Sequence, residues 1–110
     1  MSALPTTLVA LSATHHTAGL DARAAFSVSP AGVEAFYRAA RAAGLAEVVL
    51  LATCNRLEAY AVGDEAAALH ARAALIQATG VAPTELDRHL RPIPGLQAVE
   101  HLFAVVAGLD

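Results

Sequence analysis

One short segment combines a nucleophile, a cation and two hydrogen-bonding side chains: Thr53, Cys54, Asn55 and Arg56. Cys54 is the only cysteine of the chain, and a cysteine acts as a nucleophile through its thiolate. The charge of Arg56 would favour the thiolate, and its planar guanidinium could bind a substrate carboxylate through two parallel hydrogen bonds. Thr53 and Asn55 could hold a carbonyl or an oxyanion. The set fits a reaction on an acyl group that carries its own carboxylate.

A structural interpretation of the same segment stays open. Free cysteine is among the residue types most often buried. Cys54 could therefore end a strand as an inert core residue, with Arg56 in solvent. On spacing alone this second interpretation is favoured.

Histidine is the usual partner of a nucleophilic cysteine, and the chain has five histidines. His15 and His16 follow the first predicted strand, a place where functional residues are often found. His101 is on the last predicted helix, where a histidine is more often a boundary residue than a catalyst. No two histidines have the i, i+4 spacing of a zinc-binding helix, so we predict no metal site.

Composition narrows the classes of function. The 110 residues carry a formal net charge of −3, so no broad basic surface can hold nucleic acid by charge alone. The absence of lysine excludes a Schiff-base or P-loop lysine, and no glycine-rich dinucleotide fingerprint is present. One cysteine fits a reducing compartment. With no basic leader and no apolar run near the ~20 residues of a membrane span, we expect a soluble cytoplasmic domain without membrane contact.

Apolar periodicity predicts the elements that position these residues. Strands are expected at residues 7–14, 46–53, 56–62 and 90–93. Helices are expected from Pro30 to a stop at Gly44, over 65–79 before Gly80, over 83–89, and from 96 onward. Cys54 and Asn55 fall in the tight connection of a hairpin. The order favours an α+β fold, a split β-α-β (ferredoxin-like) arrangement with an antiparallel sheet and helices packed on one face, formed by residues 1–110 as a single domain.

Three segments resemble one enzyme family. TCNRLEAY (53–60) resembles the T-C-N-R-x-E-x-Y signature of glutamyl-tRNA reductases, which begin tetrapyrrole synthesis by the five-carbon route. ALSATHHTAGLDARAAFS (10–27) is similar to the family's first strand and its N-H-K-T-A-P-x-x-x-R-E loop. AVEHLFAVVAGLD (98–110) is similar to its A-V-x-H-L-F-R-V-A-S-G-L-D helix. The chain departs from these patterns at Thr14, His16, Gly19, Ala24, Ala104 and Ala107.

The resemblance implies a role for each matching residue. Cys54 would attack the ester between glutamate and tRNA and form a glutamyl thioester. His101 would line the same pocket and assist proton transfer or orient the acyl group. The substrate would be held by Thr53, Asn55, Arg56 and His15.

The resemblance also implies a cofactor and partners. In the family NADPH reduces the thioester to glutamate-1-semialdehyde, the precursor of 5-aminolevulinate and haem. NADPH-binding and dimerisation domains are absent from this chain, so it resembles an N-terminal catalytic domain that has no cofactor-binding residues and does not complete the reduction alone. Glutamyl-tRNA would be the substrate, and an aminomutase of the pathway a further partner. We expect a monomer here and a homodimer for the full-length enzyme.

Two other classes of function stay open. The same fold could serve as a non-catalytic regulatory module in which Cys54 or a histidine binds haem, or as a partner-binding module, because thiolate and imidazole are both axial haem ligands. It could also be a structural interaction domain with an inert cysteine.

Overall fold

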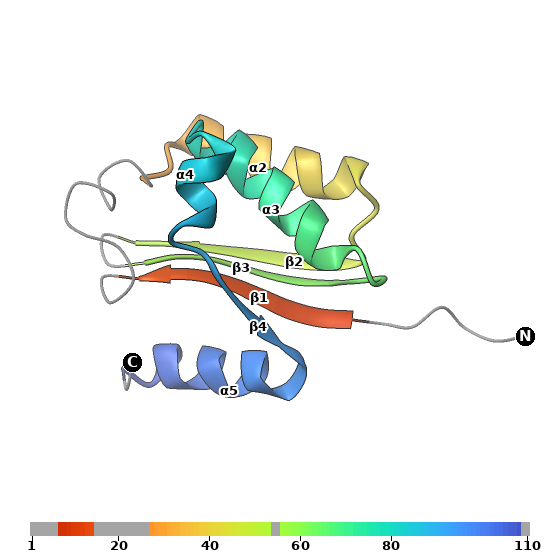
Figure 1. Cartoon of the computed structure of the whole chain (residues 1–110), viewed down its shortest axis with the longest axis vertical. Coiled ribbons are helices and arrows are strands. Elements are labelled where there is room, and N and C mark those ends of the chain that lie inside the picture. The colour runs from red at the N-terminus through yellow and green to blue at the C-terminus, as the bar shows by residue number, and fades with distance from the viewer. Residues whose placement is uncertain (1–6, 15–26, 54–55, 109–110) are drawn as a thin grey trace, which may run out of the picture.

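The computed structural model describes residues 7–14, 27–53 and 56–108. Its strands are β1 (Thr7–Thr14), β2 (Glu47–Ala52), β3 (Arg56–Gly63) and β4 (Arg91–Pro94). Its helices are α2 (Pro30–Ala42), α3 (Ala67–Thr79), α4 (Pro83–Asp87) and α5 (Gly95–Val106) (Figure 1). The order of elements along the chain is the predicted one.

The four strands form one antiparallel sheet with the order β2-β3-β1-β4. Strand β3 lies between β1 and β2, which therefore run parallel to each other on either side of it. This is the split β-α-β arrangement, and it confirms the α+β class and the antiparallel sheet. The pairing of β1 with β3 sets Ser12 opposite Glu58 and Thr14 opposite Arg56.

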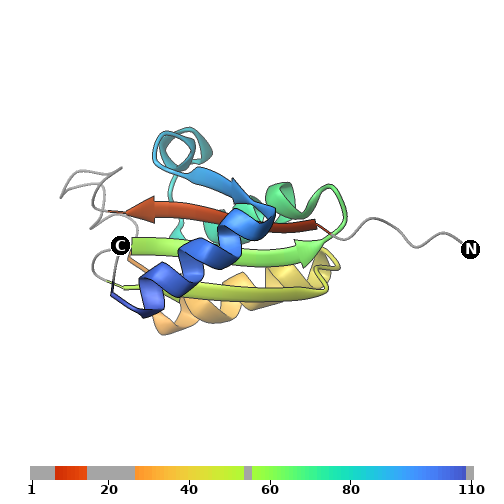
Figure 2. The ribbon, with the colours of Figure 1, turned by 90° about the horizontal axis from the view of Figure 1, so that it is seen from below.

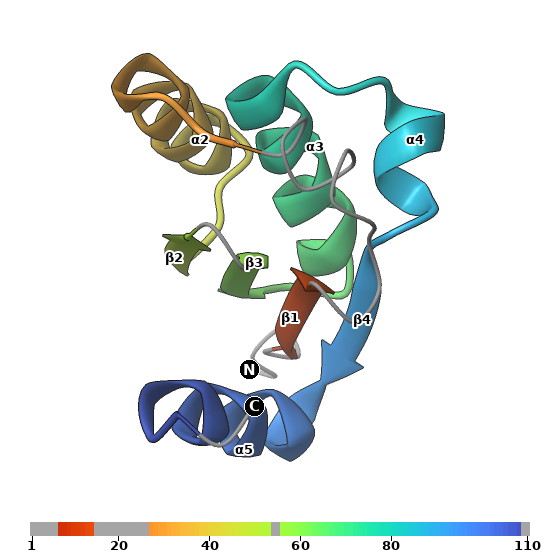
Figure 3. The same cartoon turned by 90° about the vertical axis from the view of Figure 1, so that its left-hand side faces the viewer.

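Helices cover both faces of the sheet. The prediction that the helices pack on one face holds for α2, α3 and α4, but it is wrong for α5, which lies on the other face (Figures 1 and 3). Figure 2 looks onto this second face and shows α5 running obliquely across the strands. The reason that a helix covers the second face is that β1 carries small and apolar side chains on both of its sides. The second face needs a cover of its own, because its strands contribute the apolar side chains Ala10, Tyr60 and Ile93, against which Ala98 of α5 packs.

The main core lies between the sheet and α2 and α3. Its largest fully buried apolar side chains are Phe36, Leu57, Leu75 and Leu86. Helices α2 and α3 pack closely because Gly32 has no Cβ, which would collide with the carbonyl oxygen of Ala78. The predicted start of α2 is confirmed, with the Ser29 hydroxyl accepting a hydrogen bond from the Gly32 N–H at 3.1 Å.

The connection between β2 and β3 is short. The Thr53 N–H donates to the Arg56 carbonyl oxygen at 2.9 Å, which closes the ends of the predicted hairpin. Among the described residues, no helix is long and apolar enough to cross a bilayer.

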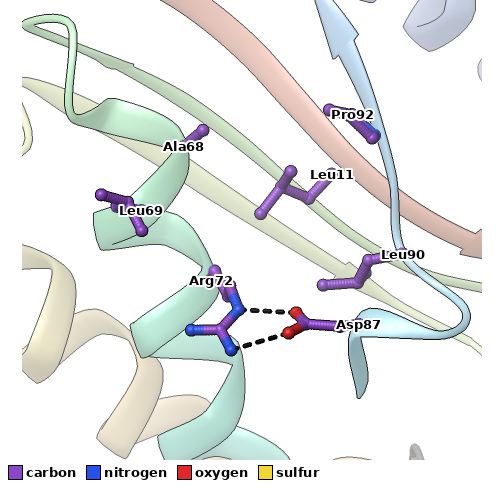
Figure 4. Close-up of a pocket in the computed structure, with 7 residues that line it drawn as sticks. All are labelled: Leu11, Ala68, Leu69, Arg72, Asp87, Leu90 and Pro92. Atoms are coloured by element: carbon purple, nitrogen blue, oxygen red, sulfur yellow. Dashed lines mark hydrogen bonds and ion pairs between the residues drawn. The ribbon is translucent and has the colours of Figure 1, made fainter. Parts of the chain in front are cut away.

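A pocket of about 240 Å³ lies on the side of the sheet that faces α3 and α4 (Figure 4). It is lined by Leu11, Ala68, Leu69, Arg72, Asp87, Leu90 and Pro92. Its two charged side chains form an ion pair with two hydrogen bonds. Arg72 Nε lies 2.6 Å from Asp87 Oδ1, and Arg72 Nη2 lies 2.9 Å from Asp87 Oδ2. The pocket contains none of the predicted site residues and opens on the opposite side from Ser12 and Glu58.

Candidate active site

A buried carboxylate lies at the centre of the second face. The Glu58 side chain is 0% exposed. Its Oε2 lies 2.6 Å from Ser12 Oγ, 3.0 Å from Arg56 Nη1 and 2.6 Å from His101 Nε2, and its Oε1 accepts from the Tyr60 hydroxyl at 2.6 Å. Four side chains from β1, β3 and α5 therefore converge on one carboxylate.

Strand geometry explains this convergence. Alternate side chains of a strand point to the same face, so Arg56, Glu58 and Tyr60 share the face that α5 covers. The β1–β3 register places Ser12 directly across from Glu58. On α5, His101 follows the buried Ala98 by three residues and so lies on the same inward side of the helix.

The surroundings of Glu58 favour its ionised form. Burial alone would raise the pKa of this carboxyl group. Hydrogen bonds from Ser12, Tyr60 and His101, together with the charge of His101 when it is protonated, outweigh burial and lower the pKa below its ordinary value. Glu58 is therefore a carboxylate at neutral pH and can only accept hydrogen bonds.

An ionised Glu58 determines which nitrogen of His101 carries the proton. Because the carboxylate is only an acceptor, Nε2 must be the donor in the 2.6 Å contact. In the neutral ring, Nδ1 is then the acceptor and can take up a proton. A carboxylate that orients an imidazole in this way is the arrangement of a general base held in one tautomer.

Glu58 also orients Arg56. The Arg56 side chain is only 8% exposed, and the Glu58 contact uses one of its five N–H donors. A guanidinium held by a buried carboxylate keeps its charge and has a fixed direction, as the recognition of a second carboxylate requires.

The predicted site residues divide into two groups. Arg56 and His101 contact the same oxygen of Glu58, and Thr53 joins them through its backbone bond to Arg56. Cys54, Asn55 and His15 lie outside the described residues. In the sequence, Cys54 and Asn55 stand between Thr53 and Arg56, so they follow β2 and directly precede β3.

Sequence reasoning did not assign a role to Glu58, Ser12 or Tyr60. Glu58 and Tyr60 alternate with apolar residues, a pattern that is typical of the solvent side of a strand. The signal that could have found them is their parity: both share the face of Arg56, and both belong to the T-C-N-R-x-E-x-Y pattern. Ser12 could not be found this way, because its hydrogen bond to Glu58 spans 46 positions of the chain. Within the described ranges, no group of three or more His, Cys, Asp or Glu side chains could hold a metal ion.

Comparison with known proteins identifies related chains. Residues 11–110 match the family model described as glutamyl-tRNA(Glu) reductase, N-terminal domain. A glutamyl-tRNA reductase of Thermus thermophilus is 44% identical over 108 residues, covering 98% of this chain and 24% of the relative. One of Saccharophagus degradans is 41% identical over 106 residues, covering 94% of this chain and 24% of the relative.

A solved structure has the same fold. The glutamyl-tRNA reductase of Methanopyrus kandleri superposes with a TM-score of 0.63 at 30% identity, covering 93% of this chain and 22% of that one. The chain thus spans about a quarter of the length of the relatives that it matches.

Proposed function

Since the chain belongs to the glutamyl-tRNA reductase family and matches its N-terminal domain, we propose that it carries out the acyl-transfer step of that enzyme. The substrate is glutamyl-tRNA and the nucleophile is Cys54. The observation that carries this proposal is the convergence of Arg56 and His101 on Glu58, next to the hairpin that contains the cysteine.

The proposed step exchanges an oxygen ester for a thioester. The thiolate sulfur of Cys54 forms a bond to the carbonyl carbon of the ester that joins glutamate to the terminal ribose of tRNA. The carbon–oxygen bond to the ribose breaks, and the ribose oxygen leaves with a proton. Glutamate remains as a thioester on Cys54.

Three members of the Glu58 network, which consists of Glu58 and the side chains bonded to it (Ser12, Arg56, Tyr60 and His101), have a place in this step. His101, with Nε2 bonded to Glu58, takes the thiol proton on Nδ1 and returns it to the leaving ribose oxygen. Arg56 binds a carboxylate of the glutamyl group. Thr53, Asn55 and His15 complete the substrate contacts, and the charge on Glu58 stabilises the imidazolium that forms in between.

NADPH does not fit the residues of this chain. The sequence has no glycine-rich fingerprint, and the sheet is antiparallel, whereas dinucleotides bind at the strand ends of parallel sheets. We therefore assign the reduction to glutamate-1-semialdehyde, with its NADPH, to another part of a longer enzyme. A cytoplasmic location, a full-length homodimer and an aminomutase partner in the synthesis of 5-aminolevulinate remain part of the proposal.

The non-catalytic alternatives have less support. In a haem-binding module, an imidazole or thiolate must reach the iron. The Nε2 of His101 is instead bonded to Glu58 at 2.6 Å, which leaves only the Nδ1 of this ring for iron. Thiol reactivity separates the proposal from a structural domain with an inert cysteine.

Thiol reactivity tests the proposal against an inert cysteine. We expect iodoacetamide to alkylate Cys54 rapidly near neutral pH, and Arg56→Ala to slow the reaction. Arg38→Ala, on an exposed position of α2, serves as the matched control and should have no effect. A thiol that reacts only after unfolding would contradict the proposal.

A further inference from the structure

The described arginines divide by their partners. Arg56 pairs with Glu58, Arg72 with Asp87, and Arg88 with Glu85 at 3.7 Å. The other three form no ion pair with a described residue: Arg38, Arg41 and Arg91. Arg38 and Arg41 belong to α2, on the far side of the sheet from the Glu58 network. Arg91 begins β4 and is exposed.

Strand register places Arg91 beside the network. Arg91 pairs with Ser12 of β1, and Ser12 pairs with Glu58 of β3, so the three residues form one row across the sheet. Ile93, two positions after Arg91, packs with Tyr60 on the face that α5 covers. Arg91 shares that face because strand side chains alternate. Neighbouring strands are about 4.8 Å apart, so the Arg91 backbone lies about 10 Å from that of Glu58.

The edge position of β4 suits Arg91 for contact with a large ligand. Strand β4 pairs only with β1 and ends the sheet. Pro92 and Pro94 have no N–H to donate, so this edge is poorly suited to adding a further strand. The exposed edge therefore presents a cation on a rigid strand rather than a row of free backbone donors.

We propose that Arg91 binds a backbone phosphate near the acceptor end of the tRNA. This inference rests on the proposed function and names the part of the substrate that the edge of the sheet contacts. The proposed function brings the glutamyl group to Arg56 at the start of β3, so the acceptor end of the tRNA has to lie near that end of the sheet. With a net charge of −3, the chain attracts phosphate only through local cations, and among the described arginines without an ion pair Arg91 is the one beside the network.

Binding of uncharged glutamate-specific tRNA to the chain tests this inference without depending on catalysis. We would measure fluorescence anisotropy in 50 mM and 200 mM salt for the wild type, Arg91→Ala and Arg38→Ala. One lost phosphate contact reduces the slope of log affinity against log salt by about 1, so the loss of affinity between the two salt concentrations should be about 3.5-fold smaller for Arg91→Ala. Arg38→Ala should bind like the wild type.

The outcomes are distinct. Unchanged binding by Arg91→Ala, an equal loss in Arg38→Ala, or no binding by the wild type would each overturn the inference. Competition by free glutamate in the wild type but not in Arg91→Ala would also overturn it, because Arg91 would then bind a carboxylate. tRNA binding that depends on Arg91, without any acylation of Cys54, would support the inference while the proposed function failed.

Discussion

Glu58 of β3 and His101 of α5 are joined by a 2.6 Å contact between Oε2 and Nε2, across 43 positions of the chain. This contact connects the sheet to the helix that covers its second face. Because the same oxygen also meets Arg56 Nη1 at 3.0 Å, one buried carboxylate fixes both the imidazole and the guanidinium that the proposed reaction uses.

Replacing Glu58 should destabilise the fold. Glu58→Gln removes the charge that compensates Arg56 in a buried place, and hydrogen bonds to charged groups contribute about 1.5–3 kcal/mol each. We expect the free energy of unfolding in urea to fall by about 3 kcal/mol, the cost of leaving a buried charge without its partner. Glu47→Gln, at an exposed position of β2, is the control. Equal stability of both variants would mean that the network contributes little.

Acid should remove the contribution of Glu58 to the free energy of unfolding. Its folded-state pKa lies below the ordinary value of 4.5, so its stabilisation is fully present above pH 4.5 and is lost as the pH falls through the lower folded-state pKa. Urea unfolding of the wild type between pH 6 and pH 3 should show this decline. Glu58→Gln should show a shallower decline in stability. Parallel curves for the two proteins would contradict the claim that ionised Glu58 stabilises the fold.

His101 should affect the rate of acyl transfer more than stability. His101→Gln keeps a side chain that can donate to Glu58 but has no nitrogen that can accept a proton in turn. We expect single-turnover acylation by glutamyl-tRNA to slow by about 10²-fold, the lower end of general acid–base effects. His70→Gln, on α3, should acylate at the wild-type rate. An unchanged rate in His101→Gln would leave His101 a purely structural role.

The shape of Arg56 should matter as well as its charge. Arg56→Lys retains a cation for Glu58 but loses the planar fork that binds a carboxylate through two hydrogen bonds. We expect a folded protein that needs a much higher concentration of glutamyl-tRNA to reach half-maximal acylation. Arg88→Lys, an exposed arginine, provides the comparison. If Arg56→Lys reached half-maximal acylation at the same glutamyl-tRNA concentration as the wild type, Arg56 would not bind the substrate.

Local sequence patterns predict the elements of this fold and their split β-α-β arrangement, but not the register of the strands or the face of the sheet that α5 covers. The apolar run of Thr7–Thr14 indicates a buried strand, and Ser29 and Gly44 bound the helix α2 as expected. The apolar stripe of α5 predicts that the helix packs against the sheet, but not which face of the sheet it covers. That choice depends on the cluster around Ala10 and Tyr60, whose members come from separate strands.

The candidate site is predictable to the same degree. The segment Thr53–Arg56 stands out because nucleophile and cation are close in sequence. In the sequence, Glu58 resembles a solvent-facing strand residue. The alternation of polar and apolar residues predicts the face of the sheet on which Glu58 lies, but not that α5 covers this face. The contacts with Ser12 and His101 depend on tertiary packing, and only the resemblance to a family signature pointed to His101.

The central claim is that Cys54 accepts the glutamyl group, and intact-mass analysis tests it most directly. The chain and a Cys54→Ser control would be exposed briefly to glutamyl-tRNA and quenched in acid. We predict a gain of one glutamyl group in the wild type, absent from the control and removed by hydroxylamine. A wild-type chain that binds tRNA but gains no mass, or a gain that persists in Cys54→Ser, would contradict the account.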